Sequence, residues 1–141
     1  ITKAGIDFLS KKGKKDGFFM MVEGGKIDYA SHRDDAATMI HEVLDFNAAI
    51  AEAYEFYKKH KDETLIIVTA DHETGAITLN DKGEYEFTSD DHSEVDVPLR
   101  VYGSEKLIKN SETVNNYEIP IRIAYILGFT EEDFPVSKLV A

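Results

Sequence analysis

Residues 18–32 read FFMMVEGGKIDYASH, and this stretch decides how the chain is interpreted. Its apolar run ends at Glu23 and a Gly-Gly pair, and Asp28 and His32 follow four residues apart. A continuous apolar run is typical of a strand buried on both faces, as in a parallel sheet. Glu23 then lies at the carboxyl end of that strand, and a single helical turn places Asp28 and His32 on the same side.

The residues that follow predict a βαβ unit. From about Asp35 to His60, apolar residues recur every three or four positions, which marks one face of a long amphipathic helix. Residues 65–68 (LIIV) form a second apolar run, and Asp71 and His72 come shortly after it. Strand, long helix and strand make a unit with parallel strands and a right-handed crossover. We therefore expect an α/β fold with a mainly parallel sheet.

The rest of the chain predicts shorter elements. We expect helices over 2–12 and 118–127, a hairpin of 76–79 with 85–88, and a strand over 97–102. No repeat or linker interrupts the sequence, and its length suffices for one compact core. Residues 1–141 are accordingly interpreted as a single domain.

Acidic and histidine side chains follow both predicted strands. In an open α/β sheet, ligands bind beyond the carboxyl ends of the strands, so Glu23, Asp71 and His72 are expected to converge. Zn²⁺ accepts carboxylate and imidazole ligands, whereas Mg²⁺ prefers oxygen ligands alone. Taken singly, each acid could equally well cap a helix or hold a loop. Their joint occurrence after two consecutive strands favours a metal site.

The composition excludes several classes of function. A formal net charge of −11 argues against nucleic-acid binding, which needs a basic surface. The same charge repels phosphate esters unless bound cations reverse the local field. The absence of cysteine excludes disulfides and cysteine-type zinc sites, and no apolar segment reaches the length of a membrane span. Because the chain starts without methionine, we expect a piece of a longer protein, with any targeting signal upstream.

The ordered motifs resemble a known family. Val-Glu-Gly-Gly, Asp-x₃-His and Thr-Ala-Asp-His, in this order, resemble the metal-binding half of the alkaline phosphatase family over about 17–75 and again around His92. Related metallophosphatases share the later Asp-His pair but are not expected to carry the Val-Glu-Gly segment, so Glu23 discriminates. The resemblance implies a three-layer α/β/α sandwich, of which residues 1–141 form the C-terminal part of the catalytic domain.

The resemblance also implies cofactors and ligands. Two zinc ions and one magnesium ion are expected. Their ligands in this chain would be Asp28, His32 and His92 for the first zinc, Asp71 and His72 for the second, and Glu23 for magnesium. The segment before His92 is shorter than in the family, by natural shortening or by excision.

The activity implied by the resemblance is hydrolysis of phosphate monoesters through a covalent phosphoserine, in a periplasmic or extracellular parent protein. Neither the nucleophilic serine nor a phosphate-binding arginine has a recognisable motif here. Ser31 and Ser93 lie beside proposed ligands but do not occupy the nucleophile context. We expect the parent protein to be a phosphatase and the isolated chain to be inactive.

Two alternatives stay open at this point. The chain could be a metal-binding or interaction module without chemistry of its own, or part of a phosphodiesterase or sulfatase of the same superfamily. An incomplete sheet would also expose an edge or an apolar face, which is a route to self-association and makes a homodimer one expectation.

Overall fold

The computed structural model describes residues 1–103, 113–130 and 132–133, in which three helices are followed by six short strands and a fourth helix. The helices are α1 (Thr2–Lys12), α2 (Lys26–Ser31), α3 (Ala36–Lys59) and α4 (Glu118–Ile126). The strands are β1 (Ile66–Val68), β2 (Glu73–Thr74), β3 (Thr78–Leu79), β4 (Tyr85–Glu86), β5 (His92–Ser93) and β6 (Arg100–Tyr102).

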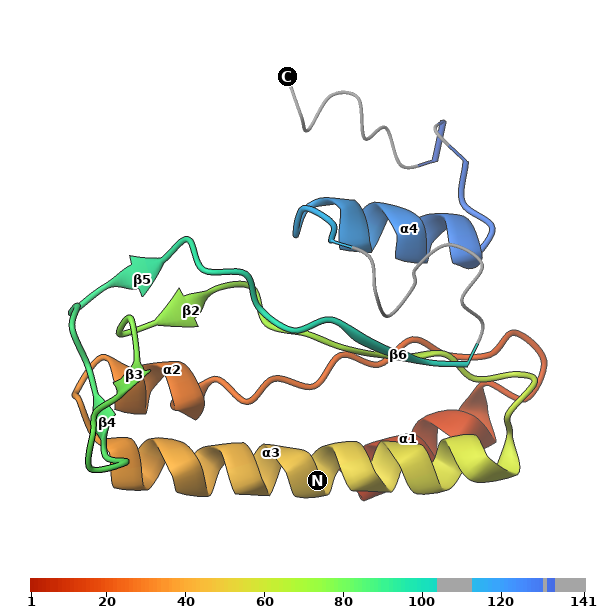
Figure 1. The fold of residues 1–141 in the computed structure, drawn as a ribbon. Coiled ribbons are helices and arrows are strands. Elements are labelled where there is room, and N and C mark those ends of the chain that lie inside the picture. The colour runs from red at the N-terminus through yellow and green to blue at the C-terminus, as the bar shows by residue number, and fades with distance from the viewer. Residues whose placement is uncertain (104–112, 131, 134–141) are drawn as a thin grey trace.

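The longest element is α3, which runs along one side of the molecule (Figure 1). Asp35 caps its start, because the carboxylate accepts hydrogen bonds from the Thr38 amide at 2.9 Å and the Thr38 hydroxyl at 2.6 Å. Lys58 and Lys59 occupy its last turn, where positive charge complements the helix dipole. The predicted long helix is confirmed, as are its cap and its basic end.

The strands pair differently from the prediction. The described residues form three two-stranded sheets, β1 with β6, β2 with β5, and β3 with β4, and each pair is antiparallel. The predicted strand over 18–22 is wrong for this structure, because that segment has no strand assignment. Several of its side chains are exposed to solvent, with Phe19 60% and Met21 72% exposed. A strand needs a partner for its backbone hydrogen bonds, and no described segment of the chain pairs with this one.

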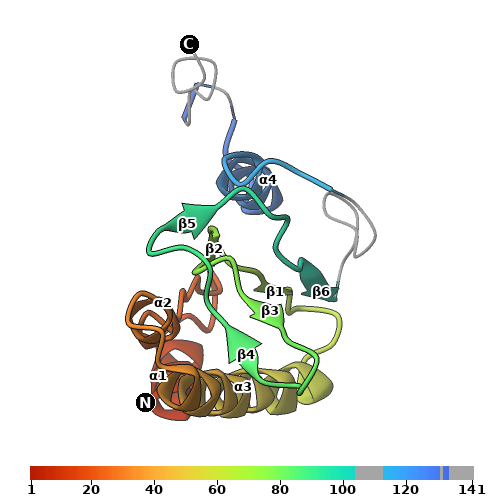
Figure 2. The ribbon, with the colours of Figure 1, turned by 60° about the vertical axis from the view of Figure 1, so that its left-hand side comes forward.

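The β1–β6 pair lies between α3 and α4 in both views (Figures 1 and 2). Leu99 and Val101 are buried toward one face, where Ile119 of α4 packs against them. On the other face, Ile66 and Tyr102 line a shallow cavity together with side chains of α3. This alternation is the period of two expected of a strand with both faces covered. Helices therefore cover both sides of an antiparallel pair, and the α/β class is confirmed at that level.

The shorter predicted elements are also found. The hairpin forms as β3–β4, the helices over 2–12 and 118–127 form as α1 and α4, and the last strand is limited to Arg100–Tyr102. Pro98 precedes that strand, as expected of a residue that cannot donate to a ladder. Within the described residues, none of the helices has both the length and the apolar character that crossing a bilayer requires.

Candidate metal centre

The short helix α2 supplies two of the predicted ligands. Asp28 lies in its first turn and His32 follows its last residue, so the predicted helical turn forms between them. His32 Nε2 lies 3.4 Å from Asp28 Oδ1. The end of α2 is joined to α3, because the Asp35 amide donates to the Ala30 carbonyl at 3.0 Å. The two ligands therefore sit on a helix whose end is fixed against the long helix.

The β2–β5 pair supplies His92. In this pair Glu73 lies opposite Ser93, and the Glu73 carboxylate accepts a hydrogen bond from the Ser93 hydroxyl. It also accepts the amides of Ala76 and Ile77, each at 3.1 Å. Burial opposes the charged carboxylate, but these hydrogen bonds outweigh it and hold the pKa of Glu73 below its usual value. Glu73 thus anchors the strand that carries His92.

Gly75 closes the base of the β3–β4 hairpin. Its amide donates to the Asp91 carbonyl at 3.1 Å, and its carbonyl accepts the amides of Thr88 at 2.9 Å and Ser89 at 3.2 Å. The residue has a φ of 92°, and a Cβ here would lie 2.7 Å from the Phe87 ring. Only glycine meets both conditions without strain. The two chain ends of the hairpin are therefore held together directly before His92.

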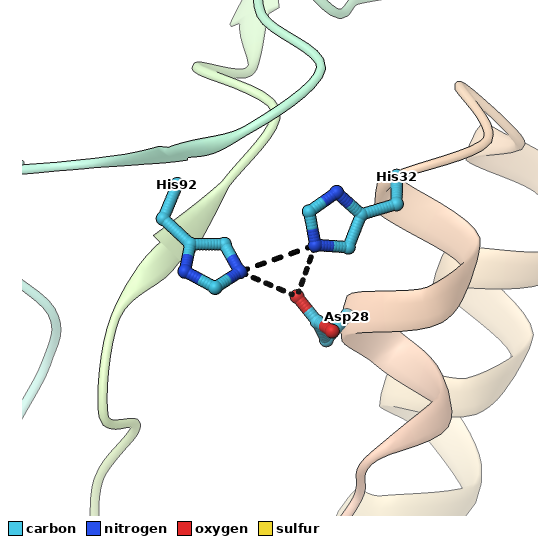
Figure 3. Close-up of side chains that lie close together, drawn as sticks. All are labelled: Asp28, His32 and His92. Atoms are coloured by element: carbon cyan, nitrogen blue, oxygen red, sulfur yellow. Dashed lines mark hydrogen bonds and ion pairs between the residues drawn. The ribbon is translucent and has the colours of Figure 1, made fainter.

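Three ligand atoms from these two regions converge (Figure 3). The Nε2 atoms of His32 and His92 are 3.1 Å apart, and they lie 3.4 Å and 3.5 Å from Asp28 Oδ1. Ligands held about 2.0–2.1 Å from a tetrahedral zinc ion are about 3.3–3.4 Å from one another. The three separations observed here fit that spacing.

The hydrogen bond at Nδ1 determines the tautomer of the His32 ring. Its Nδ1 lies 2.8 Å from the Asp90 carbonyl oxygen, which can only accept. The Nδ1 atom therefore carries the proton, and in the neutral ring Nε2 keeps a lone pair directed at Asp28 and His92. This arrangement, a backbone carbonyl behind a histidine, is typical of metal-binding imidazoles. A lone pair and a carboxylate oxygen that face each other require a cation or a proton between them.

The cluster is accessible from solvent. The side chains of Asp28, His32 and His92 are 30%, 32% and 43% exposed. Three protein ligands with a free fourth position are the pattern of catalytic zinc sites, whereas structural sites are closed by four. The donor set therefore suits an ion that also binds water or a substrate.

The other three predicted ligands are arranged more loosely. The His72 ring stacks on the His92 ring, with centroids 3.5 Å apart and an angle of 16° between the planes. The Asp71 side chain is 83% exposed, and its Oδ2 lies 3.5 Å from His72 Nε2. Glu23 is exposed in the loop before α2. The structure thus brings His72 beside the cluster, but Asp71 and Glu23 do not join it.

Sequence reasoning missed two residues that support the site, Glu73 and Thr74, and did not predict the contact of Ser93 with Glu73. The Thr74 hydroxyl donates to Asp28 Oδ1 at 2.6 Å. The hydroxyl of Ser93 is occupied by Glu73, and that of Ser31 donates to the Ile27 carbonyl at 2.9 Å. Both serine hydroxyls beside the candidate ligands therefore make hydrogen bonds within the fold.

Comparison with known proteins places these features in a family. A family model described as alkaline phosphatase matches residues 1–117. Alkaline phosphatase 4 of Bacillus subtilis (strain 168) is 48% identical over 84 residues, which are 60% of this chain and 18% of that protein. The alkaline phosphatase of Escherichia coli (strain K12) is 44% identical over 72 residues, 51% of this chain and 15% of that protein. The chain thus spans less than a fifth of the length of these relatives.

Solved structures give the same result. The alkaline phosphatase from the Antarctic bacterium TAB5 superimposes with a TM-score of 0.77 and 34% identity, over 92% of this chain and 40% of that one. A TAB5 variant solved with magnesium bound gives a TM-score of 0.77 and 33% identity, over the same shares of the two chains. A cold-active enzyme from Shewanella, at 22% identity and a TM-score of 0.80 over 89% of this chain and 49% of that one, shows the fold alone. With its family model matching most of its length, the chain belongs to the alkaline phosphatase family.

Proposed function

We propose that this chain is the metal-binding part of an enzyme that hydrolyses phosphate monoesters. The observation that carries the proposal is the convergence of Asp28, His32 and His92, with ligand atoms 3.1–3.5 Å apart on an accessible surface. Family membership supplies the reaction class. A net charge of −11 makes bound cations necessary before a phosphate can approach.

The proposed domain is larger than this chain. Residues 1–141 would form a single unit at the C-terminal side of the catalytic domain, in a three-layer α/β/α sandwich with a mainly parallel sheet. The match to only 40% of the TAB5 chain supports this proposal. So does the apolar 18–22 segment, which lacks a strand partner within the described residues. Exposed apolar side chains there would also suit a homodimer.

Two zinc ions and one magnesium ion are proposed as cofactors. Asp28, His32 and His92 would hold the first zinc, and His72 with Asp71 would contribute to the second. Glu23 would face magnesium. The stacking of His72 on His92 supports neighbouring sites. The TAB5 structure with bound magnesium supports that ion for the family.

Bound divalent cations would neutralise charge on the phosphoryl oxygens and position the attacking and leaving groups. Other residues of the chain would orient the side chains that hold these ions. The Asp90 carbonyl fixes the tautomer of His32, and Glu73 holds the strand of His92. Nucleophilic serine and phosphate-binding arginine are proposed to come from residues outside this chain, so the chain alone would not turn over substrate.

The proposal is tested with His32→Ala and, as a matched control, His41→Ala, which replaces an exposed histidine of α3 outside the cluster. Calorimetric titration of the chain with Zn²⁺ should show binding that His32→Ala weakens by about 100-fold and His41→Ala leaves unchanged. In the full-length protein, His32→Ala should lower kcat/KM for para-nitrophenyl phosphate by at least about 100-fold. The His41→Ala variant should keep the kcat/KM of the unmodified protein. Equal activity of the two full-length variants would contradict the proposal.

A metal-binding module without chemistry is the second candidate. It is favoured by the engagement of both nearby serine hydroxyls in structural hydrogen bonds. Tight stoichiometric Zn²⁺ binding by the chain, combined with no phosphatase activity in the full-length protein, would select this candidate. Robust turnover by the chain alone, abolished by His32→Ala, would show that the nucleophile lies within these residues after all.

A further inference from the structure

Thr74 is a buried polar residue whose hydroxyl has unusual partners. It lies in β2 with 7% of its surface exposed. Ser31, the other buried polar side chain among the described residues, donates to a carbonyl of its own helix. Thr74 instead reaches Asp28, which is 46 residues away in sequence, with Oγ1 and Oδ1 2.6 Å apart. Buried hydroxyls need a partner, but a helix or turn carbonyl would have served.

Counting protons assigns a direction to each contact of this hydroxyl. Thr74 has one hydroxyl hydrogen, and the Asp28 carboxylate can only accept it. His72 Nδ1 lies 3.2 Å from the same oxygen. Since the hydroxyl hydrogen is already used, His72 must donate from Nδ1 to a lone pair of Thr74. The neutral ring then has its free lone pair on Nε2.

We propose that Thr74 is a positioning residue that orients the Asp28 carboxylate and selects the Nδ1-protonated tautomer of His72 with one hydroxyl. It would link the two parts of the site, because Asp28 belongs to the converging cluster and His72 stands beside it. The assignment of metals to these two side chains rests on the proposed function. The hydrogen bonds and the tautomer do not.

The link has a consequence for both side chains. Without the hydroxyl, the Asp28 carboxylate loses the bond that holds Oδ1 toward His32 and His92, 3.4 Å and 3.5 Å away. His72 becomes free to carry its proton on either nitrogen. Hydrogen-bonding partners behind metal ligands are typically worth about 10–100-fold in metal affinity. A loss in this range is expected at the cluster when the hydroxyl alone is removed.

The test compares Thr74→Val, which keeps the shape and removes the hydroxyl, with Thr74→Ser, which keeps the hydroxyl. Long-range proton–nitrogen correlation spectra of the metal-free chain report the tautomer of each imidazole. They are recorded at the same mildly alkaline pH for all three proteins. His72 should be protonated at Nδ1 in the parent chain and in Thr74→Ser. In Thr74→Val it should be a mixture of tautomers.

Zn²⁺ titration of the same three proteins is the second readout. Thr74→Val should bind about 10–100-fold more weakly than the parent, and Thr74→Ser within about threefold of it. A parent chain with His72 protonated at Nε2 overturns the inference, even if Thr74→Val fails to fold. Unchanged spectra in Thr74→Val overturn it as well.

The two readouts separate this inference from the proposed function. If the tautomer depends on the hydroxyl but none of the proteins binds Zn²⁺, the positioning role stands and the metal assignment fails. If Zn²⁺ binds equally to the parent chain and both variants, and the tautomer of His72 is the same with and without the hydroxyl, the metal site stands and the role of Thr74 is overturned.

Discussion

The cluster of Asp28, His32 and His92 and the pair of Asp71 and Glu23 belong to one proposed site, yet their supports differ. Each member of the cluster lies in or directly after an element that is packed within the chain, α2 against α3 and β5 against β2. Asp71 follows β1 with its side chain 83% exposed, and Glu23 follows a segment without a strand partner among the described residues. The comparison teaches that contacts among the described residues are enough to assemble the first group. The second group would depend on completion of the sheet.

The largest expected effect is a difference in Zn²⁺ affinity between variants of Asp28, from the first group, and Asp71, from the second. Asp28→Ala should weaken Zn²⁺ binding by the chain at least about 100-fold, because a proposed direct ligand is lost. Asp71→Ala should change it by less than about threefold, since its exposed carboxylate stands outside the converging cluster. Calorimetric titration of both variants measures the difference. Equal losses of Zn²⁺ affinity in the two variants would contradict the distinction between the two groups.

A smaller effect is expected from Glu73→Ala, which removes the acceptor of the Ser93 hydroxyl and of two amides. Hydrogen bonds to a charged, partly buried group contribute about 1.5–3 kcal/mol, so the free energy of unfolding should fall by about 2 kcal/mol. Urea denaturation measures it. Glu94→Ala, an exposed acid beside Ser93, should stay within about 0.5 kcal/mol and serves as the control. A loss confined to Zn²⁺ binding, with stability unchanged, would argue against the anchoring role of Glu73.

The smallest effect concerns Asp35, where α3 starts. Hydrogen bonds from the Thr38 hydroxyl and amide hold the pKa of Asp35 below its usual 3.8. A lowered folded-state pKa means that the cap contributes its full stabilisation above the unfolded-state value. That contribution is lost as the pH falls through the folded-state value. The Thr38 amide resonance of the metal-free chain should therefore titrate with a midpoint below 3.8.

Asp35→Asn should abolish that titration while keeping a cap, because asparagine also accepts the amide. Asp34→Asn should leave the titration in place. Survival of the β2–β5 contacts through this pH range would show that the cluster does not depend on the first turn of α3. Their loss at the same midpoint would extend the assembled region to α3.

The sequence predicted α3 best, because its apolar period, its cap at Asp35 and its basic end agree with one another. The spacing of Asp28 and His32 was readable for the same reason, since one turn of helix fixes it locally. The pairing of β1 with β6 was not readable, because antiparallel pairing between distant strands leaves no periodic signal. The strand over 18–22 was mispredicted, since apolarity indicates burial but does not provide a pairing partner.

The support behind the ligands was beyond sequence reasoning. Thr74 and Glu73 resemble ordinary residues of a turn until the fold brings Asp28 and Ser93 against them. The hydroxyl of a threonine carries no pattern that reveals its partner 46 residues away. Local patterns thus identified candidate ligands, while the contacts that orient them emerged only from the folded chain.

The closed base of the β3–β4 hairpin has a consequence for how this region can vary. Gly75 joins both ends of the loop through three backbone hydrogen bonds, so the length of chain between them is free to change without moving His92. The exposed tip at Asp81 to Gly83 is therefore a natural acceptor for a grafted peptide, a reporter or an additional domain. A longer or shorter loop here would alter the rim around the candidate metal centre and leave its geometry intact.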